Sequence, residues 1–151
     1  MRNTRIKALA IVVLGASFVM TSAGALADEW PFISGDYWVV TGIDIKDGGG
    51  WKYANWLADE WRKDAEFAKS KGWIKDYKVL ANVHDRSDEP DLYLIRVREE
   101  IVSGAEGEKR AKEYADWNKK TIEKMVGESG NRAEYREVMS TSLLQELNFR
   151  N

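Results

Sequence analysis

The sequence predicts an α+β fold in which a four-stranded antiparallel sheet carries two helices on one face. Segments with a two-residue apolar period alternate with segments that have a three- and four-residue period, which distinguishes strands from helices. Along the chain these segments follow the order strand, helix, strand, strand, helix, strand. This βαββαβ order allows both helical connections to be right-handed crossovers. We therefore expect the strand order 4-1-3-2, with both helices on the same face.

Residues 1–27 have the pattern of an export signal. The segment MRNTRIK carries three basic residues and no acid, the apolar run Ala8–Met20 follows, and small residues lead to Ala25-Leu26-Ala27. This run is shorter than the roughly 20 residues that span a bilayer, so we expect cleavage after Ala27 and not a membrane anchor. The protein is then expected to be periplasmic or secreted, with residues 28–151 forming one mature domain.

The composition of the mature chain limits its partners. Cleavage removes three of the 23 basic residues and no acid, which leaves 20 Lys and Arg against 25 Asp and Glu, a formal charge of −5. This balance argues against a nucleic-acid partner and, after signal cleavage, against an anionic membrane. Since the chain has no cysteine, it has neither disulfides nor thiolate metal sites. We expect no metal and no cofactor.

The first predicted strand, Asp36–Lys46, has two differently used faces. We assign its longer apolar row to the helices: Tyr37, Val39, Thr41, Ile43 and Ile45. The other row consists of Trp38, Val40, Gly42 and Asp44. Because Trp38 and Val40 are too apolar to stand in water, while Gly42 leaves a gap and Asp44 adds charge, we expect a pocket on this second face.

The stretch Trp51–Lys71 predicts an amphipathic helix that follows a glycine turn and ends before Gly72. Its apolar stripe is expected to contain Ala54, Leu57, Ala58, Trp61, Ala65 and Ala68. Three tryptophans at five-residue intervals cannot share one stripe. We place Trp61 in the core, whereas Trp56, beside Tyr53, and Trp51 are expected at a subunit contact or a pocket rim.

The remaining elements follow from the same periodicities. We expect strands at Tyr77–His84, Leu92–Val102 and Ser140–Arg150, a second helix at Glu108–Val126 interrupted by GESGN, and a short helix at residues 132–139. A charged turn at Arg86–Asp91 joins the second and third strands into a hairpin.

These segments resemble the dimeric α+β barrel proteins, which have a ferredoxin-like fold. The resemblance rests on the order and texture of WVVTGIDIKDGGGWKYANWLADEWRKDAEFAKSKGWIKDYKVLAN, PDLYLIRVREE and REVMSTSLLQEL, and covers most of residues 36–150. It implies a homodimer in which two subunits pack their bare sheet faces together and enclose a cavity. Known activities in the family are those of small monooxygenases, isomerases and cyclases, while many members, including exported ones with Trp-rich first helices, have none assigned.

Two classes of function stay open. In the first, the protein is not an enzyme and binds a small apolar or aromatic ligand at the dimer cavity through Trp38, Val40, Asp44 and Trp56. In the second, it is a cofactor-poor monooxygenase or isomerase in which His84, Asn82 and Arg96 handle a proton or an oxyanion. His84 and Arg96 also have purely structural interpretations, with His84 a solvated hairpin residue and Arg96 near a strand end in water. The position of His84 relative to a cavity distinguishes the two classes.

Overall fold

The computed structural model describes residues 29–151, so the predicted export signal lies outside the described residues. The elements are β1 (Phe32–Ile45), α1 (Gly50–Trp56), a π-helical turn η1 (Leu57–Trp61), α2 (Arg62–Ser70), β2 (Asp76–Ala81), β3 (Leu92–Arg98), α3 (Gly104–Asn118), α4 (Ile122–Asn131), a 3-10 turn η2 (Arg132–Glu134) and β4 (Arg136–Phe149). Because α1, η1 and α2 are continuous and form one helical rod, Gly50–Ser70, residues 29–151 contain three separate helical rods: this one, α3 and α4. The predicted α+β fold is confirmed.

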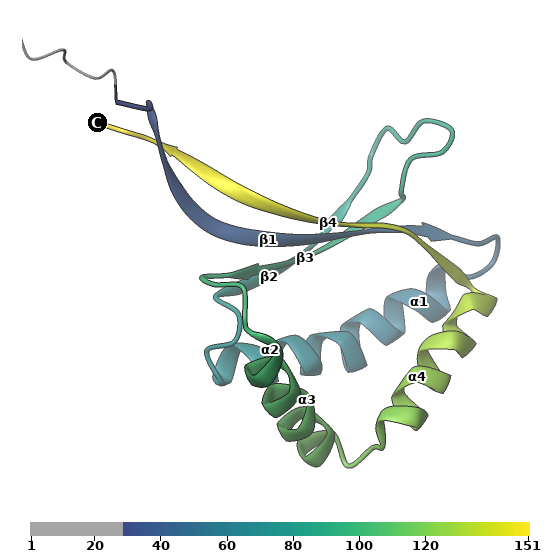
Figure 1. The fold of residues 1–151 in the computed structure, drawn as a ribbon. Helices are drawn as coiled ribbons and strands as arrows, with labels where there is room; N and C mark the ends of the chain where they lie inside the picture. The colour runs from purple at the N-terminus through teal and green to yellow at the C-terminus, as the bar shows by residue number, and fades with distance from the viewer. Residues whose placement is uncertain (1–28) are drawn as a thin grey trace, which may run out of the picture.

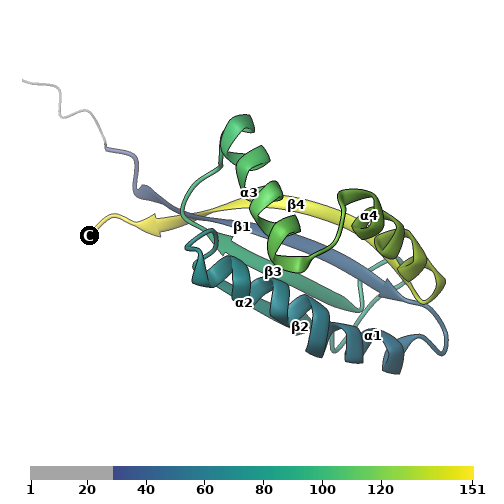
Figure 2. The same ribbon diagram turned by 90° about the horizontal axis from the view of Figure 1, so that it is seen from below.

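The four strands form one antiparallel sheet in the order β2-β3-β1-β4, which has the same neighbours as the expected order 4-1-3-2. All helices lie on one face of the sheet (Figure 1). Seen from below, the rod Gly50–Ser70 runs under the β2–β3 side, and α3 and α4 lie toward β1 and β4 (Figure 2). The sheet therefore has a helix-covered face and an open face.

The core lies between the centre of the sheet and the rod Gly50–Ser70. It consists of Ile43, Tyr53, Leu57, Trp61 and Leu94. The core position predicted for Trp61 is confirmed, but Ala54 and Ala58 of the predicted stripe are exposed. The π turn η1 explains the difference. A π turn holds more residues than an α turn, so Tyr53, Leu57, Trp61 and Ala65, which are four positions apart, stay on the buried face of the rod, and Ala54 and Ala58 do not.

The second helical region differs from its prediction in three places. The single helix expected at Glu108–Val126 is two helices, because Lys119 adopts a left-handed conformation (φ 53°) and Thr121 caps α4 by accepting a hydrogen bond from Lys124 N at 3.2 Å. The expected interruption GESGN is instead the second half of α4. The expected helix at residues 132–139 is a single 3-10 turn followed by β4, which begins at Arg136.

The hairpin between β2 and β3 begins earlier than expected. β2 ends at Ala81 and not at His84, since the next side chain is used to shape the loop. The Asn82 amide donates to Pro90 O at 3.2 Å, and its Oδ1 accepts from His84 N at 3.3 Å. Such local bonds from an asparagine side chain replace ladder bonds and end a strand.

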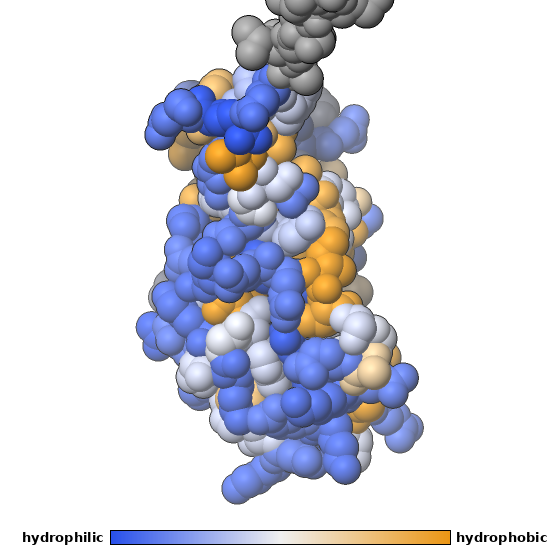
Figure 3. All heavy atoms as spheres, turned by 60° about the vertical axis from the view of Figure 1, so that its left-hand side comes forward, coloured by the Kyte–Doolittle hydropathy of each residue, from blue (hydrophilic) through white to orange (hydrophobic). Residues whose placement is uncertain are grey.

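Most of the surface in Figure 3 is hydrophilic, with one band of hydrophobic side chains running down the molecule. Several of the exposed apolar residues belong to β4, among them Leu143, Leu144 and Leu147. Among the helices of residues 29–151, none combines the length and the apolar character needed to cross a membrane.

Candidate functional site

The open face of the sheet carries the residues that the sequence assigned to a pocket. Val39 and Thr41 line a hollow with Trp61 on the helix side, so alternation along β1 places Trp38 and Val40 on the open face. Their neighbours in the register are Val97 and Leu144, on either side of Trp38, and Ile95, opposite Val40.

Trp38 is the most distinctive side chain of this face. The Lys78 ammonium lies 5.7 Å from the centroid of its ring, a cation–π contact. Its indole Nε1 is buried and donates to no group among residues 29–151. A buried donor without an acceptor costs free energy, so this position favours a ligand or partner that supplies one.

The gap expected at Gly42 does not exist. A Cβ built on Gly42 would lie 2.6 Å from Pro90 Cγ. Pro90 closes the hairpin between β2 and β3, which rises on the open side of the sheet (Figure 1). The glycine is needed for this close approach. Pro90 therefore fills the space that the sequence left open beside Gly42.

The structure does not bring His84, Asn82 and Arg96 together. His84 is exposed in the hairpin loop, beyond the end of β2. Asn82 is half-buried, and its side chain is engaged within the same loop. Arg96 pairs in register with Val39, so its side chain lies on the helix-covered face, where its guanidinium is over the Trp61 ring. No proton-transfer centre results from these three residues.

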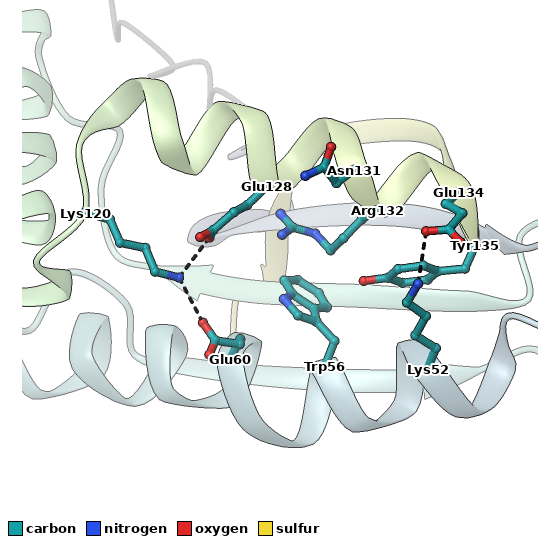
Figure 4. A pocket seen from close by; sticks show the side chains of 9 residues that line it. All are labelled: Lys52, Trp56, Glu60, Lys120, Glu128, Asn131, Arg132, Glu134 and Tyr135. Carbon is teal, nitrogen blue, oxygen red and sulfur yellow. Dashed lines mark hydrogen bonds and ion pairs between the residues drawn. The ribbon is translucent and has the colours of Figure 1, made fainter.

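Trp56 lies elsewhere, in a cleft of about 350 Å³ between the rod Gly50–Ser70 and the α4–η2 segment (Figure 4). Its ring stacks on Tyr53, with centroids 5.5 Å apart and planes 11° apart. The Arg132 guanidinium lies 4.3 Å from the centroid of the same ring. The structure thus separates Trp56 from Trp38, and the predicted ligand-binding residues belong to two different surfaces.

Ion pairs close the two ends of the Trp56 cleft (Figure 4). Lys120 bridges Glu128 at 2.8 Å and Glu60 at 3.4 Å, and Lys52 binds Glu134 at 3.0 Å. The hydrogen bond with Lys120 lowers the pKa of the Glu128 carboxyl. Because each lysine already has a carboxylate partner, the cleft presents balanced charges, and its contacts attach α4 to the first helical rod.

Sequence reasoning missed most of this cleft. The apolar spacing does not place Tyr53 in the core, although it is buried beneath Trp56, and Arg132 and Tyr135 come from a segment expected to be helical. Trp51, expected at a rim, is 82% exposed and does not line the cleft. Local sequence patterns do not indicate a role for Arg132 in this cleft, because its contact with Trp56 joins residues 76 positions apart in the sequence.

Within residues 29–151, no group of three or more His, Asp or Glu side chains is placed to hold a metal ion. Comparison of the chain with protein-family models, with curated proteins and with solved structures gives no match. The function must therefore be inferred from the surfaces of the fold.

Proposed function

We propose that the protein is exported and acts as a homodimeric binding protein that holds a small apolar or aromatic ligand between the open sheet faces of two copies. In this proposal the domain is ferredoxin-like, and two domains form a dimeric α+β barrel. The main support is that helices cover only one face of the sheet (Figure 1). The register places Val97 and Leu144 beside Trp38 on the other face.

The composition of the open face supports a protein partner. Ile95 and Val97 at its centre are already buried within one copy, at 4% and 6% exposed, whereas Leu80 and Leu144 remain 47% and 54% exposed and supply the apolar surface that a partner would cover. Apolar surface gains about 25 cal/mol for each Å² removed from water, so pairing of two such faces is favourable. A two-fold dimer would bring the same residues together from both subunits.

The same face supports a small ligand near Trp38. Its Nε1 is buried and has no acceptor within residues 29–151, so a ligand that displaced the covering side chains would gain one directional polar contact within apolar surroundings, which is the usual composition of a small-molecule site. An enzymatic function has weaker support, because His84, Asn82 and Arg96 occupy separate places. Binding is therefore the function that the geometry supports best.

Two neighbouring leucines of β4 provide a matched test. Leu144 and Leu143 are 54% and 53% exposed, and they point to opposite faces because Leu144 pairs with Trp38 and Leu143 with Val39. In sedimentation equilibrium of the secreted protein, we expect a dimer that Leu144→Asp weakens by about 2–4 kcal/mol. Leu143→Asp is expected to leave the dimer intact.

Trp38→Ala tests the ligand part of the proposal. We expect it to weaken dimerisation or ligand uptake by about 2–4 kcal/mol, as loss of a large buried aromatic side chain does. Native mass spectrometry of the periplasmic protein would detect a ligand that co-purifies with the wild type and is lost from the variant. A wild type that stays monomeric at high micromolar concentration would contradict the dimer and its cavity.

A further inference from the structure

A second pocket lies on the helix-covered face, between β3, α2 and α3. Its volume is about 290 Å³. Three arginines line it: Arg96 and Arg98 from β3, and Arg110 from α3. No acidic side chain is among the lining residues. The rest of the wall is largely apolar, with Trp73, Ile74 and Val102 beside small residues of α2 and α3.

Of these three arginines, only Arg110 forms ion pairs within residues 29–151. Arg110 binds Glu106 at 2.8 Å and Glu100 at 3.3 Å. Arg96 and Arg98 form no ion pair within residues 29–151, and both Nε atoms are buried without a hydrogen-bond acceptor. The Nε–H groups of a guanidinium are strong donors, and leaving them buried without an acceptor is costly.

Arg96 and Arg98 occupy neighbouring positions on the same side of β3, and the Arg96 guanidinium lies 5.6 Å from the centroid of the Trp61 ring. Arg96 and Arg98 are two positions apart on one strand, so both side chains leave the same face about 6.6 Å apart. Burial lowers the pKa of Arg96, and the positive charge of Arg98 lowers it further. Asp64 and Tyr114 act in the opposite direction on Arg96, although neither forms an ion pair with it. The Asp64 carboxylate thus partly offsets the charge of Arg96, whereas Arg98 has no ion-pair partner within residues 29–151.

We infer that this pocket binds a small organic carboxylate whose apolar or aromatic body lies against Trp73 and Ile74, while Arg96 and Arg98 hold the carboxylate oxygens. A planar carboxylate matches the fork of an arginine and accepts two parallel hydrogen bonds. The volume suits a ligand with a single ring. This site lies across the sheet from the proposed dimer cavity, so it does not depend on the proposed function.

Binding of simple probes to the secreted protein tests this inference. The probes are phenylacetate, the uncharged isostere phenylacetamide, and inorganic phosphate. Titrations are followed by NMR through the Nε–H signals of the arginines. We expect phenylacetate to shift the signals of Arg96 and Arg98, and to bind more tightly than phosphate. We expect no shift with phenylacetamide.

Three variants locate the site. Arg98→Gln is expected to raise the Kd for phenylacetate by about tenfold, because it removes one charged donor pair. Arg136→Gln is the matched control: Arg136 is also buried with an unpartnered Nε, but it lies on β4, outside the pocket. This control is expected to bind like the wild type.

The third variant, Ala111→Leu, fills the pocket from α3 while keeping both arginines, and it is expected to abolish binding. Because Ala111 is exposed, a leucine at this position should not prevent folding. Ala111→Leu therefore still tests the site if Arg98→Gln does not fold. Equal binding of phenylacetamide or of phosphate, an equal loss in Arg136→Gln, or unchanged Arg96 and Arg98 signals in phenylacetate would each overturn the inference.

Discussion

The first helical rod and the α3–α4 pair cover the same face of the sheet in different ways. The rod Gly50–Ser70 buries five side chains: Tyr53, Leu57, Trp61, Ala65 and Phe67. Neither α3 nor α4 buries any residue. Since apolar burial is the largest favourable term in folding, the rod supplies most of the stability of the helical layer.

The difference originates in β3. On the helix-covered side this strand presents Leu92 and Leu94 near the core and then Arg96 and Arg98. The apolar half of the strand packs against the rod, and the cationic half faces α3. A helix cannot bury an apolar stripe against two arginines, so α3 is attached at its side, where Trp117 stacks on Phe67 with centroids 4.2 Å apart.

The largest effect is expected from removing the tryptophan at the centre of the better-packed region. Trp61→Ala should lower the free energy of unfolding by about 3–5 kcal/mol, because it leaves a cavity under the sheet. The matched change Trp117→Ala, in a side chain that is 42% exposed, should cost about 1–2 kcal/mol. Urea unfolding followed by circular dichroism measures both. Equal losses of unfolding free energy in the two variants would show that the two regions contribute equally to the stability of the fold.

A smaller effect is expected at alkaline pH through Tyr53. Burial raises the pKa of Tyr53 to about 12, from 10.0. Below pH 10 the hydroxyl is protonated in both folded and unfolded chains. Between pH 10 and 12 only the unfolded chain loses the proton, so the free energy of unfolding should fall with rising pH, by about 2 kcal/mol.

Tyr53→Phe separates this effect from those of other tyrosines. The Tyr53 hydroxyl is buried and has no hydrogen-bond partner within residues 29–151, so its removal should not destabilise the protein at pH 7. The variant should retain only the alkaline losses due to residues such as Tyr114, whose pKa burial also raises. Unfolding free energies measured from pH 8 to 12 would contradict this if wild type and variant declined in parallel.

The sequence predicts the well-packed region better than the other. The two-residue period of β1 places Val39 and Ile43 on the helix-covered face, and this assignment agrees with the structure. Near α3 and α4 the apolar residues are fewer and exposed, so their spacing carries little information. The helix boundaries in this region depend instead on local capping, such as that by Thr121, which begins α4 separately from α3.

The candidate sites could be predicted only in part. The face of the sheet on which Trp38 and Val40 lie can be predicted, because alternation along one strand is local information. The contact of Trp56 with Arg132, the filling of the Gly42 gap by Pro90, and the pairing of Arg110 with Glu100 and Glu106 depend on how distant segments meet. The apolar periodicity of a single segment gives no information about these contacts between segments.

A further prediction concerns the cap of α4. Thr121→Ala removes the acceptor for Lys124 N and should cost about 1 kcal/mol. Because α4 buries no residue, the loss should appear as local opening of α4, with faster amide exchange in residues 122–126 than in the rod Gly50–Ser70. The corresponding cap of α3, in Ser103→Ala, is the control and should affect α3 only. Faster exchange throughout the protein would show that α4 does not open independently.

The smallest effect is expected at the junction between the two weaker helices, and it should be stabilising. Lys119 has φ 53° and ψ 33°, a left-handed conformation that is unfavourable for residues with a Cβ. Lys119→Gly should therefore raise the free energy of unfolding by about 0.5–1 kcal/mol, although glycine also increases the entropy of the unfolded chain. Asp88→Gly, at φ 69° in the exposed hairpin, provides a comparison outside the helical layer. Asp tolerates this conformation better than Lys, so its gain should be smaller. If Lys119→Gly instead destabilises the protein, the gain in unfolded-state entropy outweighs the relief of strain, and the junction is not a strained point of the α3–α4 region.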